Sequence, residues 1–344
     1  MHINGFGFHP ALTLCVTSQR IRMVAAQRGV SLRRGEGPGI EHLWRRWFHD
    51  MALTLSHLNQ QLAVNGPSRQ ILLRVVDLLS NELFVVDDSL WRCHLDGFFA
   101  IVALYGGVDT IRETCSNPPW LALQFGLQYA VMGNACSPAA DQIEGVYCWS
   151  DHQIRSLHAF TFVPNFSSPA VLFLAVHRIN RLRVLVSRGG ERTKAVAAAA
   201  GLRRAAEETA QLPLKTLLGT LHKAAVILYA LLSLPPDLAR PFVGGAHREG
   251  DEAVDPAKAA RLHHRETLLA TLPLTAGHMK ISALGWIFAV LGAASLDGSD
   301  GTKAWILTQL RGVGIASILG KRHGRLGKVL LEAVYDIMRR EETK

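Results

Sequence analysis

The sequence predicts an all-α fold of many helices, arranged as one domain over residues 1–344. Apolar residues recur at steps of three and four along most of the chain, which is the repeat of a helix face that packs on a core. No run alternates between apolar and polar residues at a period of two, so no β-sheet is expected. Apolar residues make up 49% of the chain and charged residues 19%, which is enough for a large core.

Two helices are predicted on either side of residue 90, after an N-terminal segment 1–10 that we expect to be disordered. The apolar face of the first is formed by Ile71, Val75, Leu78, Leu79 and Leu83, and that of the second by Trp91, Leu95, Phe98 and Val102. Asp87-Asp88-Ser89 offers a cap for the start of the second helix, and Gly106-Gly107 offers its end. Trp91, Leu95 and Phe98 are therefore predicted to be core residues.

Three helices are predicted in the middle of the chain, over Leu172–Val186, Thr193–Ala210 and Leu214–Leu234. The alanine run 197–200 favours a helix because alanine has the highest helix propensity. Pro235-Pro236 is expected to stop the third helix, since proline cannot donate a backbone hydrogen bond.

The last third of the chain is predicted to begin with a mobile loop over about 240–254, which is rich in glycine and charge. Asp255-Pro256 then signals a helix start, with the carboxylate as N-cap and proline at the first helical position. Helices are expected at 257–272, 279–296, 302–319 and 326–339, with a turn at 297–301.

The best candidate for a membrane span is the apolar stretch Ile281–Leu296. Its length of about 16 residues falls short of the roughly 20 that cross a bilayer. Lys280 and Asp297 flank it, which fits a buried central helix. The N-terminus lacks the basic and apolar regions of a signal peptide. We therefore expect no membrane partner and an intracellular protein.

Charge and cysteine spacing give no positive sign of nucleic acid or metal. The net charge is +9, but the basic residues are dispersed, so direct sequence-specific binding of nucleic acid is not expected. The five cysteines form no C-x-x-C pair, which predicts neither a metal site nor a redox motif. Reduced thiols would suit the cytoplasm or nucleus.

Standard catalytic and cofactor motifs are absent. Gly314–Gly320 followed by Lys321 has the wrong spacing for a phosphate loop, and Arg322 stands where Ser or Thr would hold magnesium. Neither H-E-x-x-H nor G-x-S-x-G occurs. No cofactor is therefore expected.

Several histidines remain as candidates for chemistry. If residues 151–158 are helical, Asp151, Arg155 and His158 share a face that could position a proton donor or bind an anion, whereas the alternative is a polar surface turn. His94 is either a functional group or a buried neutral histidine bonded to a neighbour. His263-His264 fits a solvated surface. The candidate catalytic side chains are His94, Asp151, His152, His158 and His278.

The block from Leu78 to Gly107 resembles a known pattern. Trp91, His94, Leu95 and Gly97, followed by Gly106-Gly107, are similar to the "W-x-x-H-L-x-G … G-G" block of the fungal-specific transcription factor domain, the middle homology region of zinc binuclear cluster regulators.

Later segments resemble the same family in the same order, so that the resemblance covers about residues 10–340. Arg178, Asn180 and Arg183 are similar to its "I-x-R-I-N-x-L-R" helix, and Leu228-Tyr229 to its "L-Y" helix. Trp286 is similar to the tryptophan of its "W-P-x-x-I-A-G-x-E-A" helix, although Ile287 and Ala293 depart from that pattern.

The resemblance implies an all-helical regulatory domain in transcription regulation, in the nucleus or cytoplasm, with a protein partner or homodimer and a small-molecule ligand. The family's N-terminal C-x2-C-x6-C zinc cluster is missing from this chain, where Cys15 is the one early cysteine. The alternative is a natural-product enzyme of secondary metabolism, a cyclase or isomerase that reuses the helical pocket.

Overall fold

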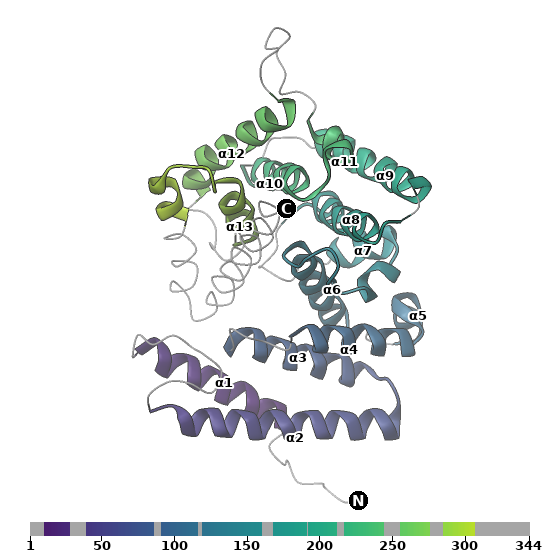
Figure 1. The fold of residues 1–344 in the computed structure, drawn as a ribbon. Coiled ribbons are helices and arrows are strands. Elements are labelled where there is room, and N and C mark those ends of the chain that lie inside the picture. The colour runs from purple at the N-terminus through teal and green to yellow at the C-terminus, as the bar shows by residue number, and fades with distance from the viewer. Residues whose placement is uncertain are drawn as a thin grey trace, which may run out of the picture. The chain divides into compact units, whose positions relative to one another are not determined.

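The computed structural model describes residues 10–27, 39–85, 91–115, 119–159, 168–190, 192–211, 217–243, 255–275 and 285–306. Every regular segment within these ranges is a helix, and none is a strand, which confirms the predicted all-α class (Figure 1). Contacts within the chain group it into two compact units, Met1–Tyr129 with Ile143–Trp149, and Ala130–Gln142 with Ser150–Lys344. One domain over residues 1–344 stays a prediction.

The first unit is built on a long helix that the sequence reading did not single out. Its helices are α1 (Pro10–Gln27), α2 (Glu41–Asn65), α3 (Arg69–Val85), α4 (Trp91–Leu104), α5 (Gly107–Thr114) and the short η1 (Gly145–Cys148). Helix α1 packs on α2 and α3, and α3 packs on α4. Trp44 and Trp47 of α2 are fully buried, with their rings 5.8 Å apart in an edge-on arrangement. Helix α6 (Trp120–Ala135) runs from the first unit into the second.

The predicted faces of α3 and α4 are confirmed with one correction. Ile71, Val75, Leu78 and Leu79 of α3 are buried, as are Leu95, Phe98 and Val102 of α4. Trp91 is only half-buried, because it is the first residue of α4, and the Arg92 guanidinium lies 5.3 Å from its ring centre. The caps at residues 87–89 and the side chain of Leu83 lie outside the described residues.

Gly106 and Gly107 end α4, as the sequence predicts. Their φ angles of 95° and 90° are in the left-handed region, which glycine adopts without a steric penalty. A Cβ on Gly106 would also lie 2.9 Å from Oγ1 of Thr110. The chain reverses here and begins α5 at once.

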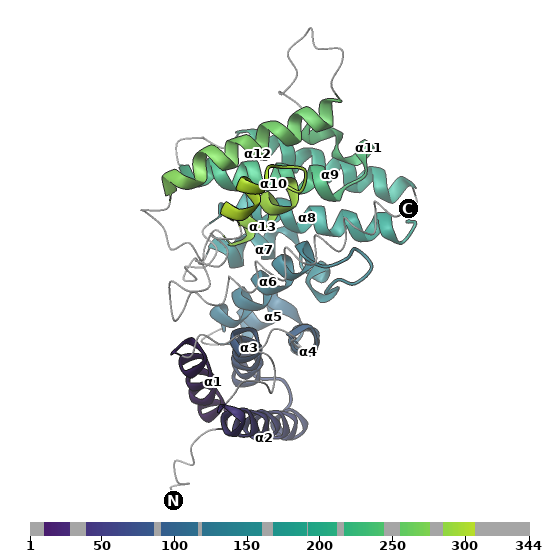
Figure 2. The ribbon, with the colours of Figure 1, turned by 60° about the vertical axis from the view of Figure 1, so that its left-hand side comes forward.

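The second unit is a set of packed helices. They are α7 (Asp151–Ala159), α8 (Ala170–Ser187), α9 (Arg192–Gln211), α10 (Leu217–Ser233), α11 (Pro236–Ala239), η2 (Arg240–Phe242), α12 (Pro256–Thr275) and α13 (Gly285–Ala294). Helix α8 packs on α7, α9 and α10, and α10 packs on α12 and α13. Figure 2 shows α12 lying along α10. Both α8 and α10 are buried over most of their length.

Start and stop signals in this unit are mostly as predicted. Helix α10 ends at Ser233, just before Pro235-Pro236. The Ala257 backbone N–H donates a 3.0 Å hydrogen bond to Oδ1 of Asp255, so Asp255 caps α12. The turn predicted at 297–301 is misplaced, because α13 ends at Ala294, the turn covers residues 295–298, and residues 300–306 are already helical.

The predicted loop at 240–254 is wrong at its start. Arg240–Phe242 forms the 3-10 helix η2, because Phe242 is buried and anchors the backbone there. Residues 244–254 lie outside the described residues, as do the predicted helical segments 279–284, 307–319 and 326–339 and the N-terminal residues 1–9.

The described part of the apolar stretch 281–296 is a core helix. Trp286, Ile287 and Leu291 of α13 are buried. Among the described residues, no helix combines the length and apolar character that crossing a membrane requires.

Candidate functional site

His94 pairs with a carboxylate from the neighbouring helix. Its Nε2 lies 3.4 Å from Oε2 of Glu82, which belongs to α3. The His94 side chain is 13% exposed and that of Glu82 is 2% exposed. This supports the expectation of a sheltered histidine with a polar partner, but the partner is Glu82 and not a residue of its own helix. His94 therefore links α3 to α4 inside the first unit.

Residues 151–159 form helix α7, so the alternative of a polar surface turn is wrong. The Gln153 N–H donates to Oγ of Ser150 at 3.2 Å, and the Ser150 N–H donates to Oε1 of Gln153 at 2.8 Å. This reciprocal pair is a capping box, in which a serine and a glutamine three residues later satisfy the free N–H groups of a helix start. The Ser150-Asp151-His152-Gln153 sequence carried that signal, and the sequence reading missed it.

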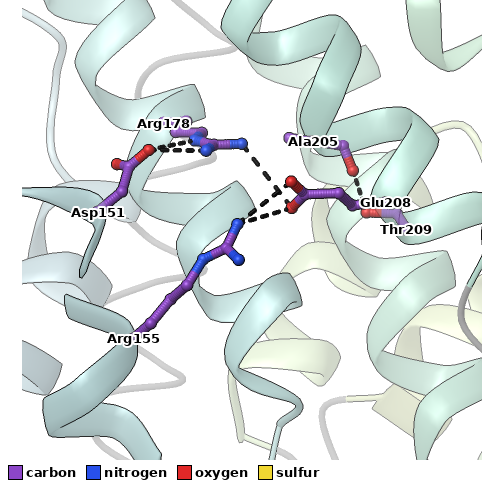
Figure 3. A network of polar contacts seen from close by, with 6 residues as sticks. All are labelled: Asp151, Arg155, Arg178, Ala205, Glu208 and Thr209. Atoms are coloured by element: carbon purple, nitrogen blue, oxygen red, sulfur yellow. Dashed lines mark hydrogen bonds and ion pairs between the residues drawn. The ribbon is translucent and has the colours of Figure 1, made fainter. Parts of the chain in front are cut away.

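Asp151 and Arg155 enter an ionic network that joins α7, α8 and α9 (Figure 3). Oδ2 of Asp151 accepts hydrogen bonds from Nε and Nη2 of Arg178, at 3.2 and 2.7 Å. Nη2 of Arg155 donates to both carboxylate oxygens of Glu208, at 3.2 and 3.1 Å. Arg178 Nη1 also lies 3.9 Å from Oε2 of Glu208. Two arginines thus face two carboxylates, so the network is neutral and does not form an anion site.

His158 does not share this network, although it lies on the same helix. Its side chain is buried, with Nε2 2.8 Å from the carbonyl oxygen of Ser168 and the ring stacked 4.5 Å from that of Phe173. Burial lowers the pKa of His158 below its usual value. The imidazole is therefore neutral at pH 7 and packed among core residues, which does not suit a solvent-facing proton donor.

Two more buried histidines accompany it in the second unit. Burial lowers the pKa of His177 to about 4 and that of His222 to about 4. The Nδ1 atom of His222 lies 2.9 Å from the carbonyl oxygen of Leu218. Neutral, core-packed imidazoles are thus a recurring feature of this unit.

The remaining histidines that the sequence analysis named differ in their exposure to solvent. His152 is exposed on α7. His263 is exposed on α12, as predicted, while its neighbour His264 is half-buried, and burial lowers its pKa to about 4. His278 lies outside the described residues. Within the second unit, Asp151 and His158 share helix α7 but have separate surroundings, the first in the ionic network and the second in the core.

Asn180 and Arg183 of α8 form a buried polar cluster with Tyr229 of α10. The Tyr229 hydroxyl donates to Oδ1 of Asn180 at 2.5 Å and accepts from Nη1 of Arg183 at 2.7 Å. All three side chains are at most 7% exposed. Burial raises the pKa of Tyr229, which keeps its hydroxyl protonated and able to donate.

The same cluster holds the end of α6 and the turn after it. Asn180 Nδ2 donates to the carbonyl oxygen of Val131 at 2.8 Å. Arg183 donates to the carbonyl oxygens of Asn134 and Ser137, at 3.0 and 2.8 Å. Asn134 lies in the last turn of α6 and Ser137 just after it, so the guanidinium adds hydrogen bonds to carbonyls at the C-terminal end of this helix.

An aromatic residue from α13 completes the arrangement. The Trp286 ring lies edge-on to Tyr229, with centroids 6.0 Å apart and planes at 73°. The group of Asn180, Arg183, Tyr229 and Trp286 is called the Arg183 cluster below. Its members come from three separate motifs of the resemblance, which the sequence reading quoted without placing them together.

The other residues of the resemblance have local roles. Arg178 belongs to the ionic network, and Leu95 is fully buried in α4. Gly97 lies in the middle of α4, and a Cβ added there would meet no atom within 4 Å. Close packing therefore does not require glycine at position 97.

A basic pocket in the second unit was missed by the sequence reading. It has a volume of about 300 Å³ and lies where α10, α12 and the end of α13 meet. Its lining residues are Leu232, Lys258, Arg261, Leu262, Arg265, Ala293, Ala294, Leu296 and Asp297. Lys258, Arg261 and Arg265 fall on one face of α12, at a spacing of three and four that could have revealed it. This site is called the α12 pocket below.

A second pocket lies in the first unit, between α2 and α3. It has a volume of about 670 Å³ and is lined mostly by polar side chains, among them His57, Arg69 and Asp77.

No protein-family model, no curated protein and no solved structure matches this chain.

Proposed function

We propose that this chain is a regulatory helical module of the fungal-specific transcription factor type that carries no DNA-reading zinc cluster. It acts in the nucleus or cytoplasm, through a protein partner, a second copy of itself or a bound small effector. The observation that carries this proposal is the Arg183 cluster. Residues matched to three separate family motifs, in α8, α10 and α13, meet around Tyr229 inside one unit.

The convergence supports the resemblance for a physical reason. A buried guanidinium is costly unless its N–H groups are hydrogen-bonded. Here Arg183 needs the Tyr229 hydroxyl and the carbonyls of Asn134 and Ser137 at the same time. Asn180, Arg183 and Tyr229 therefore depend on one another. Without any one of them, a buried polar group of another would have no hydrogen-bond partner. Motifs that match by chance have no reason to meet in this way.

The surroundings of the polar residues favour a binding module over a cyclase or isomerase. Asp151 is already paired with Arg178, and His158 is packed against Phe173. Both described pockets are open to solvent, whereas cyclisation chemistry calls for a cavity that excludes water.

An exposed apolar stripe supports contact with a protein partner. Leu12, Val16 and Met23 on α1 are each at least 50% exposed. Their spacing places them on one side of the helix. Exposed apolar side chains gathered on one side of a helix are a feature of protein-interaction surfaces.

Tethering tests the proposal directly. The full chain, fused to an unrelated DNA-binding domain, is expected to change transcription of a reporter that carries the cognate site. Arg183→Met should abolish that effect, while His263→Gln, at an exposed position, should preserve it. A fusion that reaches the nucleus at the level of the control and leaves the reporter unchanged would overturn the regulatory proposal.

A second measurement tests whether the chain binds DNA in a sequence-selective way. A gel-shift series with the purified chain, across a range of salt concentrations, should show no sequence-selective complex. Any weak binding should disappear as salt rises, because it comes only from phosphate contacts. Tight, sequence-selective binding at high salt would contradict the proposal.

A further inference from the structure

The lining of the α12 pocket combines cationic side chains, called its rim below, with apolar side chains, called its floor. Lys258, Arg261 and Arg265 supply the rim from one helix face. Leu232 and Leu262, with Ala293, Ala294 and Leu296, supply the floor from α10, α12 and the end of α13. A volume of about 300 Å³ is at the lower end of the range for small-molecule sites.

The side chains that line the pocket carry more positive than negative charge. Arg265 is paired, since its Nη1 lies 3.0 Å from Oδ1 of Asp297 and its Nη2 lies 3.3 Å from Oε1 of Glu266. Within the described part of the chain, neither Lys258 nor Arg261 has an ion-pair partner. Two of the three cations that line the pocket therefore have no ion pair within the described residues, and the carboxylate of Asp297 is taken up by Arg265.

The placement of these cations is unfavourable for the helix alone. Lys258 lies in the first turn of α12, where the helix dipole favours acidic side chains. Arg261 stands three residues after Lys258 and four before Arg265, and like charges at these spacings repel one another. An anion bound in the pocket would relieve both effects.

We propose that the α12 pocket binds a small amphipathic organic acid. Its carboxylate would lie between Lys258 and Arg261, where charge-assisted hydrogen bonds form, and its short apolar chain would cover Leu232, Leu262 and the α13 alanines. A fully polar anion would leave the floor uncovered, and a neutral apolar molecule would leave the two cations unmatched. As the effector of the regulator, this ligand rests on the proposed function; binding itself does not.

Calorimetric titration of the purified full chain at low salt and pH 8 tests the proposal with three probes: octanoate, 1-octanol and inorganic phosphate. Octanoate is expected to bind at least about tenfold more tightly than either of the others, because it alone matches both rim and floor. Added salt should weaken the binding of octanoate and leave that of octanol unchanged.

Variants assign the binding to this pocket. Lys258→Gln with Arg261→Gln should weaken octanoate binding by about tenfold or more and leave octanol binding unchanged. His263→Gln, an exposed change on the opposite side of the same helix, is the matched control and should bind octanoate as the parent does. Circular dichroism melting checks that each variant is folded.

The outcomes separate the two proposals. Equal affinity for octanoate and octanol, phosphate binding as tight as octanoate, no binding at millimolar concentration, or a double variant that binds normally would each overturn the pocket proposal. If octanoate binds as expected but the tethered chain leaves its reporter unchanged, the regulatory proposal fails and the pocket stands. If the reporter responds but octanoate does not bind, only the pocket proposal fails.

Discussion

Arg183 donates a 2.7 Å hydrogen bond to the hydroxyl oxygen of Tyr229, and within the described chain no carboxylate pairs with this buried guanidinium. Its remaining bonds go to the main-chain carbonyls of Asn134 and Ser137. A positive charge is thus held in the second unit by hydroxyl and carbonyl dipoles and by the Tyr229 ring, whose centroid lies 5.7 Å from Cζ of Arg183. The stability of α6, α8 and α10 as a group is expected to depend on these few contacts.

Tyr229→Phe removes the hydroxyl at the centre of the Arg183 cluster. It leaves Oδ1 of Asn180 and one N–H group of Arg183 each short of a partner, so the free energy of unfolding should fall by about 1–3 kcal/mol. Urea unfolding followed by circular dichroism measures this loss. Thr267→Val is the control, because the Thr267 hydroxyl bonds only to a carbonyl of its own helix. Equal stability of Tyr229→Phe and the parent would contradict the inferred role.

Glu208→Gln should weaken the ionic network in a salt-dependent way. The carboxylate is the shared partner of Arg155 and Arg178, and its loss leaves the two guanidinium groups facing each other. Because these side chains are partly exposed, a loss of about 0.5–1 kcal/mol is expected at low salt, and less at high salt. Unfolding at two ionic strengths measures it. Lys303→Gln, in an exposed pair with Asp300, should have little effect under both conditions.

Stability should fall as pH drops from about 6.5 towards 4. His177 and His222 have a pKa of about 4 in the folded chain, below the usual value of 6.5, because burial disfavours the charged form. Between these values the unfolded chain binds more protons, so each histidine lowers the free energy of unfolding by up to about 1.4 kcal/mol per pH unit. Above about pH 6.5 both histidines are uncharged in the folded and in the unfolded chain, so the free energy of unfolding no longer depends on pH through them.

Urea unfolding at several pH values between 4.5 and 7.5, on His177→Gln and His222→Gln, checks this origin. Each variant should lose part of the pH dependence of the parent, whereas the exposed His152→Gln should retain it all. An unaltered slope in both buried variants would show that other groups control the acid response.

Gly126→Ala should destabilise the first unit. A Cβ on Gly126 would lie 2.2 Å from a ring carbon of the buried Phe98, so the core must move. Overpacking of this kind costs about 1–3 kcal/mol, which outweighs the higher helix propensity of alanine. Gly97→Ala is the matched control in α4, where a Cβ meets nothing within 4 Å. That variant should be as stable as the parent or up to about 1 kcal/mol more stable, as thermal unfolding would show.

Much of the fold could be predicted because the signals are local. The apolar spacing of Ile71, Val75 and Leu78 follows the repeat of one helix, and that face is buried. Asp255 before Pro256 marks a helix start by the capping chemistry of adjacent residues. The capping box at Ser150 and Gln153 was equally local, and it could have predicted α7.

The candidate site was harder to predict because its chemistry depends on partners far away in the sequence. His158 and Asp151 share a short helix, yet one is packed against Phe173 and the other is bound to Arg178. The amphipathic patterns of α1 and α2 were not singled out either, although Trp44 and Trp47 of α2 fill the core of the first unit.

The sequence by itself determined the all-helical class and the ends of several helices, since propensity, capping and periodicity act over a few neighbouring residues. It also supplied the residues of the Arg183 cluster, one motif at a time. Only the tertiary structure decided that these residues meet, that Glu208 bridges Arg155 and Arg178, and that Lys258 and Arg261 line a pocket while having no ion-pair partner among the described residues. Those outcomes depend on which helix packs against which, and long-range packing is not encoded in any one local pattern.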